Sequence, residues 1–297
     1  MLLVEGRVPS RPFGVAGEEV GEVELAPPKP AHAACGGPGS IPAIWVCWRG
    51  SGRGGTRPSI ICYNRAFAPI VTKMTATLLA LDTATEACSA ALLHQGRIYH
   101  RTEVIPRLHA QRLLPMIEEV LGEAGIAIAD VDALVFGRGP GAFTGVRIAT
   151  GMVQGLAFAT GKPVIGISNL AALAQRAWRE QGAEQVCAAI DARMDEVYWG
   201  CYQLQGGVMV LVGEERVCAP QQVSLSAPLD SPVGAGTGWQ YAERLAVPVS
   251  DSWPQMLPDA VDLLALAQPA WDAGQLQDAA DAQPVYLRDK VATPKQR

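Results

Sequence analysis

The chain lacks most of the features that mark membrane-spanning, secreted and metal-binding proteins. No apolar run reaches the roughly 20 residues that a membrane-spanning helix needs. The opening apolar run, residues 1–4, is too short for a signal peptide. The seven cysteines form no CxxC pair, and their odd number and irregular spacing argue against a disulfide framework or a zinc knuckle. We therefore expect a cytoplasmic protein with reduced thiols and no membrane attachment.

Acidic residues outnumber basic residues, but not evenly along the chain. Residues 1–73 carry eight Lys and Arg against five Asp and Glu, a balance of +3, whereas residues 74–297 carry 16 against 24, a balance of −8. An acidic body repels a phosphate backbone at long range. If the chain serves a nucleic acid, we expect the contact to be indirect and to pass through another protein.

The first 73 residues show no helical or strand period and are interrupted by Gly and Pro clusters, as in residues 27–30, 36–39 and 50–55. Such a composition does not build a core. Two interpretations stay open: a disordered tail, or a non-native extension translated from a misplaced start codon. The second is favoured, because Met74 immediately precedes the first clear strand.

Beyond Met74 the periodicity predicts regular α/β structure. Three strands come first and are followed by alternating helices and strands, which predicts a mixed sheet with helices on both faces. This order is typical of one half of an actin-like protein. The expected strands are 77–82, 87–93, 97–104, 133–136 and 163–167. The expected helices are 109–124, 144–160 with Thr144 as its N-cap, and 168–181 with Ser168 as its N-cap.

A second half begins near Cys187. The sequence Ala-Ile-Asp at 189–191 resembles Ala-Leu-Asp at 80–82, and in both places an acidic residue and a new strand follow. Gly206-Gly207 then predicts a hairpin turn. We interpret this as a weak internal duplication. The predicted organisation is an α/β, actin-like fold with two tandem halves and mixed sheets, residues 74–182 and a reduced half at 183–297.

Two aspartates and one glycine-rich loop raise the question of a nucleotide site. Asp82 and Asp191 each end a predicted strand, where a carboxylate either coordinates a Mg-nucleotide or caps a tight turn. No glycine follows closely, so the backbone there cannot approach a phosphate. The loop with Gly139 and Gly141 precedes a helix, as anion-binding loops do, but lacks the ending of a P-loop. We interpret Asp82, Gly139, Gly141 and Asp191 as vestigial positions of a nucleotide cleft.

Two helices carry more apolar surface than one sheet needs. The apolar residues of helix 109–124 form two stripes, although one stripe suffices to cover a sheet. Small residues recur at four-residue spacing in helix 144–160 and would let another helix approach closely. The second stripe is either buried inside this chain or used as a partner surface, and the pattern alone favours neither. The candidate interface residues are Leu113, Met116, Ile117, Val120, Ile148, Gly151, Met152 and Gly155.

Three stretches of the chain resemble the TsaB family, also called YeaZ. They are LALDTATEACS at 79–89, GRGPGAFTGVR at 137–147 and AIDARMDEVY at 189–198, and the ending PVYLR at 284–288 also resembles the family's tail. The stretches occur in the right order over most of the chain from Met74 onward. Residues 1–73 resemble nothing in the family.

The resemblance implies an actin-like (ASKHA) fold and a non-catalytic accessory subunit. Such a subunit binds and activates the TsaD-type transferase that forms threonylcarbamoyladenosine in tRNA, with a TsaE-type ATPase as a further partner. It has no cofactor of its own, since ATP and a metal belong to the partner enzyme, and it meets tRNA only indirectly. The resemblance also implies that helices 109–124 and 144–160 form the partner surface, which pairs with a second copy when the chain is alone.

No metal site is expected. TsaD is the catalytic paralogue of the family that this chain resembles. It carries a metal-binding His-x-x-x-His pair on its first helix, where positions i and i+4 lie on one face. Here His109 is followed four residues later by Leu113, and we interpret His109 as a surface or capping residue. The alternative functions are an actin-fold ATPase or kinase, a metallopeptidase, and a free-standing homodimeric binding protein.

Overall fold

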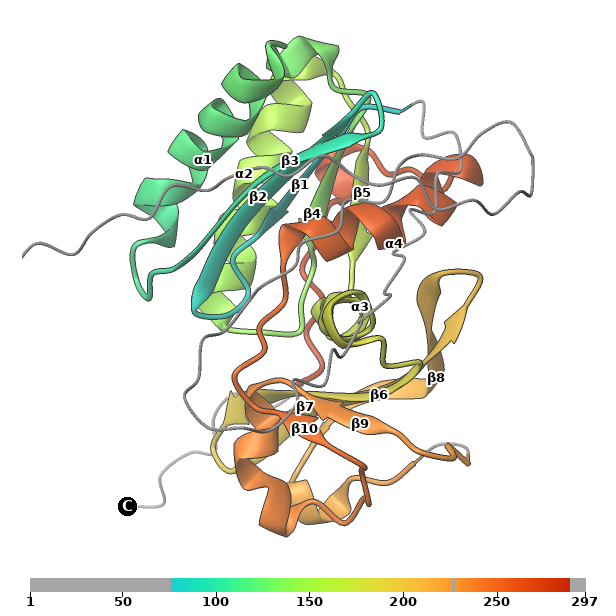
Figure 1. The fold of residues 1–297 in the computed structure, drawn as a ribbon. Helices are drawn as coiled ribbons and strands as arrows, with labels where there is room; N and C mark the ends of the chain where they lie inside the picture. Colours follow the sequence, from blue (N-terminus) through green and yellow to red (C-terminus); the bar gives the residue numbers. More distant parts are fainter. Residues whose placement is uncertain (1–75, 226–227, 289–297) are drawn as a thin grey trace, which may run out of the picture. The chain divides into compact units, whose positions relative to one another are not determined.

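The computed structural model describes residues 76–225 and 228–288 (Figure 1). These residues belong to one compact unit, Arg65–Arg297. The predictions made for residues 1–73 lie outside the described residues. Along the described ranges, no helix combines the length and apolar character that crossing a bilayer would require.

The first sheet is mixed, with the strand order β3-β2-β1-β4-β5. β1 pairs antiparallel with β2 and parallel with β4, so the predicted order of antiparallel strands followed by strand–helix units is confirmed. The strands are β1 Leu78–Asp82, β2 Ala87–His94, β3 Arg97–Val104, β4 Ala133–Gly137 and β5 Val164–Ile167.

Different helices cover the two faces of this sheet. Alternate residues of a strand point to opposite faces. Leu79 and Leu81 of β1 therefore join the core under α1 and α2, whereas Leu78 and Ala80 join the core under α4. Figure 1 shows α1 and α2 on one side of the strands and α4 on the other. The helices are α1 His109–Ala124, α2 Phe143–Thr160 and α4 Ala260–Asp272.

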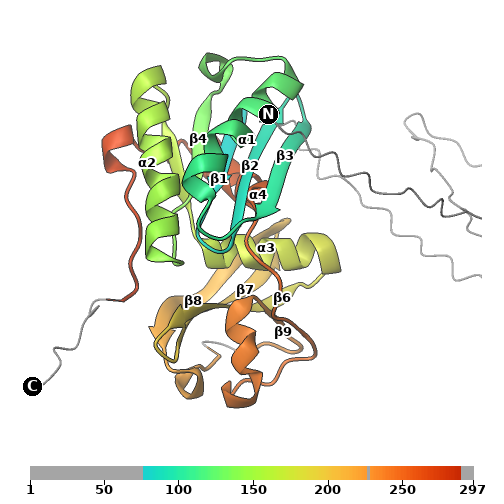
Figure 2. The same cartoon turned by 90° about the vertical axis from the view of Figure 1, so that its left-hand side faces the viewer.

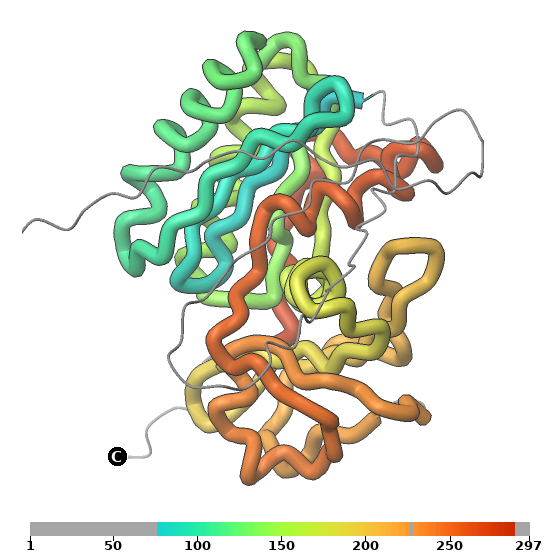
Figure 3. The backbone as a smooth tube through the Cα atoms, in the orientation of Figure 1, coloured from blue at the N-terminus to red at the C-terminus, as the bar shows by residue number. Residues whose placement is uncertain are grey.

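The second sheet has the order β10-β9-β6-β7-β8. Its β6 alternates in the same way: Val186 and Ala188 pack against α3, whereas Cys187 and Ala189 pack against Trp239 of the 3₁₀ helix η3. In Figure 3, α3 is seen end-on between α4 and this sheet. The elements are α3 Asn169–Gln181, β6 Gln185–Arg193, β7 Glu196–Gln205, β8 Val208–Cys218, β9 Val233–Ala235, η3 Thr237–Arg244 and β10 Ser252–Trp253.

The second sheet repeats the first in part, as the sequence predicts. β6, β7 and β8 form an antiparallel meander like β1 to β3, and β9 pairs parallel with β6 as β4 pairs with β1. The expected range 183–297 is wrong at its C-terminal end. α4 packs on the first sheet and Ala282 is buried in the core under α1 and α2, because that sheet needs apolar cover on both faces.

Helix ends agree with the sequence in one case and differ in another. The Ser168 hydroxyl caps α3 by accepting from the N–H groups of Leu170 and Ala171, as predicted. Thr144, the expected N-cap of α2, lies inside the helix, because Ala142 occupies the cap position without a side-chain bond. The start of α2 is held instead by hydrogen bonds to the turn that follows β1.

The described cysteines, Cys88, Cys187, Cys201 and Cys218, form no disulfide bond with one another. Cys187 and Cys201 face each other across β6 and β7 with a sulfur–sulfur distance of 3.5 Å. Burial raises the pKa of the Cys88 thiol to about 12, so this thiol is poorly reactive at neutral pH. The other three cysteines lie outside the described residues.

Candidate functional site

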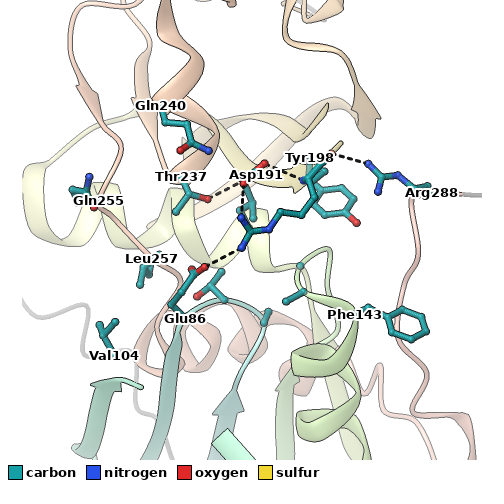
Figure 4. A pocket seen from close by; sticks show the side chains of 17 residues that line it. Glu86, Val104, Phe143, Asp191, Tyr198, Thr237, Gln240, Gln255, Leu257 and Arg288 are labelled. Carbon is teal, nitrogen blue, oxygen red and sulfur yellow. Dashed lines mark hydrogen bonds and ion pairs between the residues drawn. The ribbon is translucent and has the colours of Figure 1, made fainter. Parts of the chain in front are cut away.

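A cavity of about 540 Å³ lies where the two halves meet, beside the carboxyl ends of β1 and β6 (Figure 4). Residues of both halves line it. The first half contributes the turn after β1 and the loop before α2, and the second contributes the β6–β7 turn and η3. The lining residues include Glu86, Gly141, Phe143, Asp191, Arg193 and Arg288.

Asp191 faces this cavity and serves the turn that follows it. Its Oδ1 accepts from the backbone N–H of Arg193 at 2.9 Å and from the Tyr241 hydroxyl at 3.4 Å. Its Oδ2 lies 3.3 Å from a terminal nitrogen of Arg193, and the other terminal nitrogen of Arg193 lies 3.6 Å from Glu86. A guanidinium thus sits between carboxylates of both halves (Figure 4), and Asp191 caps its turn as one of the two interpretations predicts.

Asp82 has a different environment. It is fully buried and is not among the residues that line the cavity. Its Oδ1 accepts from the Asn169 side-chain amide at 2.6 Å and from the Ala84 N–H at 3.3 Å, and its Oδ2 has no partner among the described residues. Burial raises the pKa of Asp82 to about 7, against the lowering effect of the Asn169 bond. The structure therefore does not bring Asp82 and Asp191 together on one cavity wall.

The glycine-rich loop before α2 packs against the turn after β1. The Ala142 N–H donates to the Ala84 carbonyl at 2.7 Å, and the Thr83 hydroxyl donates to the Gly145 carbonyl at 2.7 Å. A Cβ at Gly141 would collide with the Ala84 carbonyl. An N–H group that a phosphate would use at this helix start is thus already bonded. The geometry fits a rigid strand-to-helix turn.

The C-terminal segment packs against the loop before α2. It runs along α2 from the 3₁₀ helix η4, Ala279–Asp281, toward the second half (Figure 2). The Val285 N–H donates to the Arg138 carbonyl at 2.7 Å, and Val285 lies close to Gly139, whose φ of 99° favours glycine. Arg288 ends the segment by binding the Glu196 carboxylate and the Arg193 carbonyl.

The expected apolar patch on α1 is wrong, because its residues belong to the core. The structure places α1 against both the sheet and α2, so both of its stripes are covered. Leu114 is the exception and is 43% exposed. The buried candidates are Leu113, Met116, Ile117 and Val120. His109 is also buried, with its Nε2 unbonded among the described residues, and so is not the surface or capping residue that we expected.

The outer face of α2 keeps the remaining candidates. Gly151 and Gly155 are exposed, and a Cβ built on either would meet nothing within 4 Å. Ile148 and Met152 are half-buried against the core. Phe158 is 86% exposed on the same helix. The role of these residues as a partner surface stays a prediction.

Three candidate functional residues, Phe143, Arg147 and Tyr286, were not identified from the sequence. Phe143 and Arg147 are one turn apart on α2, and Tyr286 contacts both from the C-terminal segment. The four-residue spacing of Phe143 and Arg147 was a readable signal, but nothing local in the sequence joins them to Tyr286. Fold alone brings the three together.

Two tandem α/β halves with mixed sheets define a protein of the actin-like class. A family model described as TsaD, tRNA N6-adenosine threonylcarbamoyltransferase, matches residues 100–244.

Comparison with named proteins narrows the class. The tRNA threonylcarbamoyladenosine biosynthesis protein TsaB of Haemophilus influenzae is 44% identical over 228 residues, which cover 74% of this chain and 96% of that protein. TsaB of Escherichia coli is 44% identical over 224 residues, or 73% of this chain and 97% of that protein. The solved structure of YeaZ from Pseudomonas aeruginosa is 62% identical, with a TM-score of 0.70, and covers 71% of this chain and 100% of that one. The chain belongs to the TsaB family.

Proposed function

We propose that the chain acts in the biosynthesis of threonylcarbamoyladenosine in tRNA, as a non-catalytic accessory subunit that binds and activates a TsaD-type transferase. The names of the relatives supply the pathway. The observation that carries the accessory role is the outer face of α2, where two open glycines adjoin a highly exposed phenylalanine.

The α2 face suits the close approach of another helix. Packed helices lie about 8–10 Å apart, depending on the side chains at the contact. Glycines one turn apart permit the short end of that range, and Phe158 offers an aromatic side chain to a partner pocket. A second copy of the chain would use the same face, since a two-fold dimer buries one patch on both subunits. Self-association and partner binding would then compete.

The cleft supports an accessory role by the way its polar groups are used. Asp191 is engaged by Arg193, the Ala142 N–H is bonded to Ala84, and Asp82 is buried away from the cavity wall. Groups that would serve phosphate and metal in an ATPase thus serve the fold instead. On this proposal ATP and metal belong to the partner enzyme, a TsaE-type ATPase joins the complex, and tRNA is met only through the partners.

A graded series at Gly155 tests the proposal. Alanine adds one methyl group and leucine adds a branched side chain, while both raise helix propensity. We expect the Gly155→Leu variant to remain folded and to lose at least tenfold in affinity for the TsaD-type protein by calorimetry. The Gly155→Ala variant controls for propensity and should stay within about threefold of the wild type, since threefold is under 1 kcal/mol. Equal binding by both variants would place the partner elsewhere.

A further inference from the structure

Arg147 is held more firmly than an exposed arginine usually is. Its Cζ lies 3.6 Å from the centroid of the Phe143 ring and 5.6 Å from that of Tyr286. Its Nε donates to the Tyr286 hydroxyl at 2.8 Å. The two rings are themselves in contact, with centroids 5.8 Å apart. The guanidinium is therefore fixed by stacking and by one hydrogen bond before any ligand arrives.

The terminal nitrogens of this fixed guanidinium are unused. Within residues 76–225 and 228–288, Arg147 takes part in no ion pair, and its Nη1 and Nη2 have no hydrogen-bond partner. The two arginines that line the cavity differ in this respect, because Arg193 pairs with Glu86 and Asp191, and Arg288 binds Glu196. A planar fork of donors matches a carboxylate or a phosphate in two-point contact.

The position of Arg147 links it to the proposed contact face. It lies one turn before Gly151 on α2, so a partner helix that follows the open glycines reaches Arg147 next. Phe143 is 53% exposed and Tyr286 is 46% exposed, and together they form an aromatic rim around the guanidinium. Arginine and tyrosine near the centre of an interface contribute much of its binding energy.

The charge of the chain decides between the two anions. Residues 74–297 carry a balance of −8, since 16 basic residues stand against 24 acidic ones. A field of that sign disfavours the many phosphates of a nucleic acid, whereas a single carboxylate set among apolar side chains meets only its immediate surroundings.

We propose that Arg147, fixed by Phe143 and Tyr286, is a preset receptor for one Asp or Glu side chain of the partner protein. This inference rests on the proposed function and names the chemistry of the partner at that surface. The fork binds the carboxylate through Nη1 and Nη2, while Nε stays with Tyr286. Because stacking has already ordered the guanidinium, little side-chain freedom is lost when the partner binds.

The test compares four variants of the full chain for affinity to the TsaD-type protein. Arg147→Gln removes the charge, and Arg147→Lys keeps it but loses the planar fork. Tyr286→Phe removes only the hydroxyl that holds Nε. Arg97→Gln is the matched control, because Arg97 is also exposed and lies 5.3 Å from an aromatic ring, that of Tyr99, but on β3.

We expect losses of at least thirtyfold for Arg147→Gln, tenfold for Arg147→Lys and threefold for Tyr286→Phe, with no change for Arg97→Gln. The salt dependence of binding should be weaker in Arg147→Gln than in the wild type. Circular dichroism checks that all four variants fold.

Three results overturn the inference, each in a distinguishable way. If Arg147→Gln binds like the wild type while Gly155→Leu does not, the partner uses α2 without a carboxylate at Arg147. If the wild type itself does not bind the TsaD-type protein, the proposed function fails with it. If Arg147→Gln weakens binding of the chain to tRNA but not to the protein, the fork receives a phosphate.

Discussion

Asp82 ends β1 and Asp191 lies two residues before the end of β6, so the two occupy similar places in the two halves, yet their surroundings differ. Asp82 is buried, accepts from Asn169 at the start of α3, and has its pKa raised to about 7 by burial. Asp191 faces a cavity and is paired with the Arg193 guanidinium. The same sequence pattern thus produces a fully buried group in one half and a cavity-lining group in the other. The neighbours that each strand end receives, and not the aspartate itself, decide its role.

The largest effect on stability should follow from placing a carboxylate in the apolar core without a hydrogen-bond donor of the kind that Asn169 gives to Asp82. Met116 of α1 is fully buried under the first sheet. We expect Met116→Asp to lower the free energy of unfolding by about 3–5 kcal/mol, because it leaves a buried charge without a partner. Leu114→Asp, on the exposed side of the same helix, is the matched control and should change it by about 0.5 kcal/mol or less. Urea unfolding measures both, and a stable Met116→Asp variant would contradict the assignment of α1 to the core.

The next effect concerns Asp82 and pH. Its pKa is raised in the folded state, so the folded chain binds more protons than the unfolded chain between about pH 4 and pH 7. Its stabilising contribution is complete below about pH 4 and is lost as the pH rises to about 7. The loss is about 4 kcal/mol at most, at 1.36 kcal/mol per pKa unit.

Asp82→Asn removes this titration while keeping an acceptor for the Asn169 amide. The stability of Asp82→Asn relative to the wild type should therefore rise between pH 4.5 and pH 7.5 in urea unfolding. A flat difference for Asp82→Asn would mean that its carboxylate ionises as readily as an exposed one.

The smallest effect is expected at Arg193. The Arg193 side chain is 77% exposed and that of Glu86 is 44% exposed, so solvent screens both of its ion pairs although Asp191 is mostly buried. Pairs of this kind contribute about 0–1 kcal/mol. Arg193→Gln should therefore lower the free energy of unfolding by less than about 1 kcal/mol, as measured with urea. A loss of about 3 kcal/mol or more would show that this guanidinium holds the two halves together.

The sequence contained most of the fold because local signals determine its elements. The strand end at Asp82, the Ser168 cap and the hairpin at Gly206-Gly207 all follow from nearby residues and are present, whereas β6 continues two residues past Asp191. The return of α4 to the first sheet could not be predicted locally, because it depends on which face the earlier elements leave uncovered.

The candidate site was less readable for the same reason. Helical periodicity identifies which residues of α1 share a face but not what lies against that face, so Leu113 and Met116 were assigned to a partner surface and are core. The contact between Arg147 and Tyr286 joins positions 139 residues apart. A contact between positions so far apart produces no recognisable spacing pattern in the sequence, whereas the glycines of α2, which are four residues apart, do produce one.

The central claim is that the α2 face, and not the cavity, carries the accessory role. Activation of the transferase tests it most directly, because one assay compares a variant of the α2 face with a variant of the cavity. The measurement is the rate at which a TsaD-type enzyme, supplied with its other pathway proteins, forms threonylcarbamoyladenosine in tRNA when each variant of this chain is added. The double variant Asp191→Asn, Arg193→Gln changes the cavity, and we expect it to support the wild-type rate. The Gly155→Leu variant changes the α2 face, and we expect it to support at most about a tenth of that rate, which corresponds to about 1.4 kcal/mol in activation free energy. Full activation by Gly155→Leu together with loss of activation by the cleft variant would contradict it.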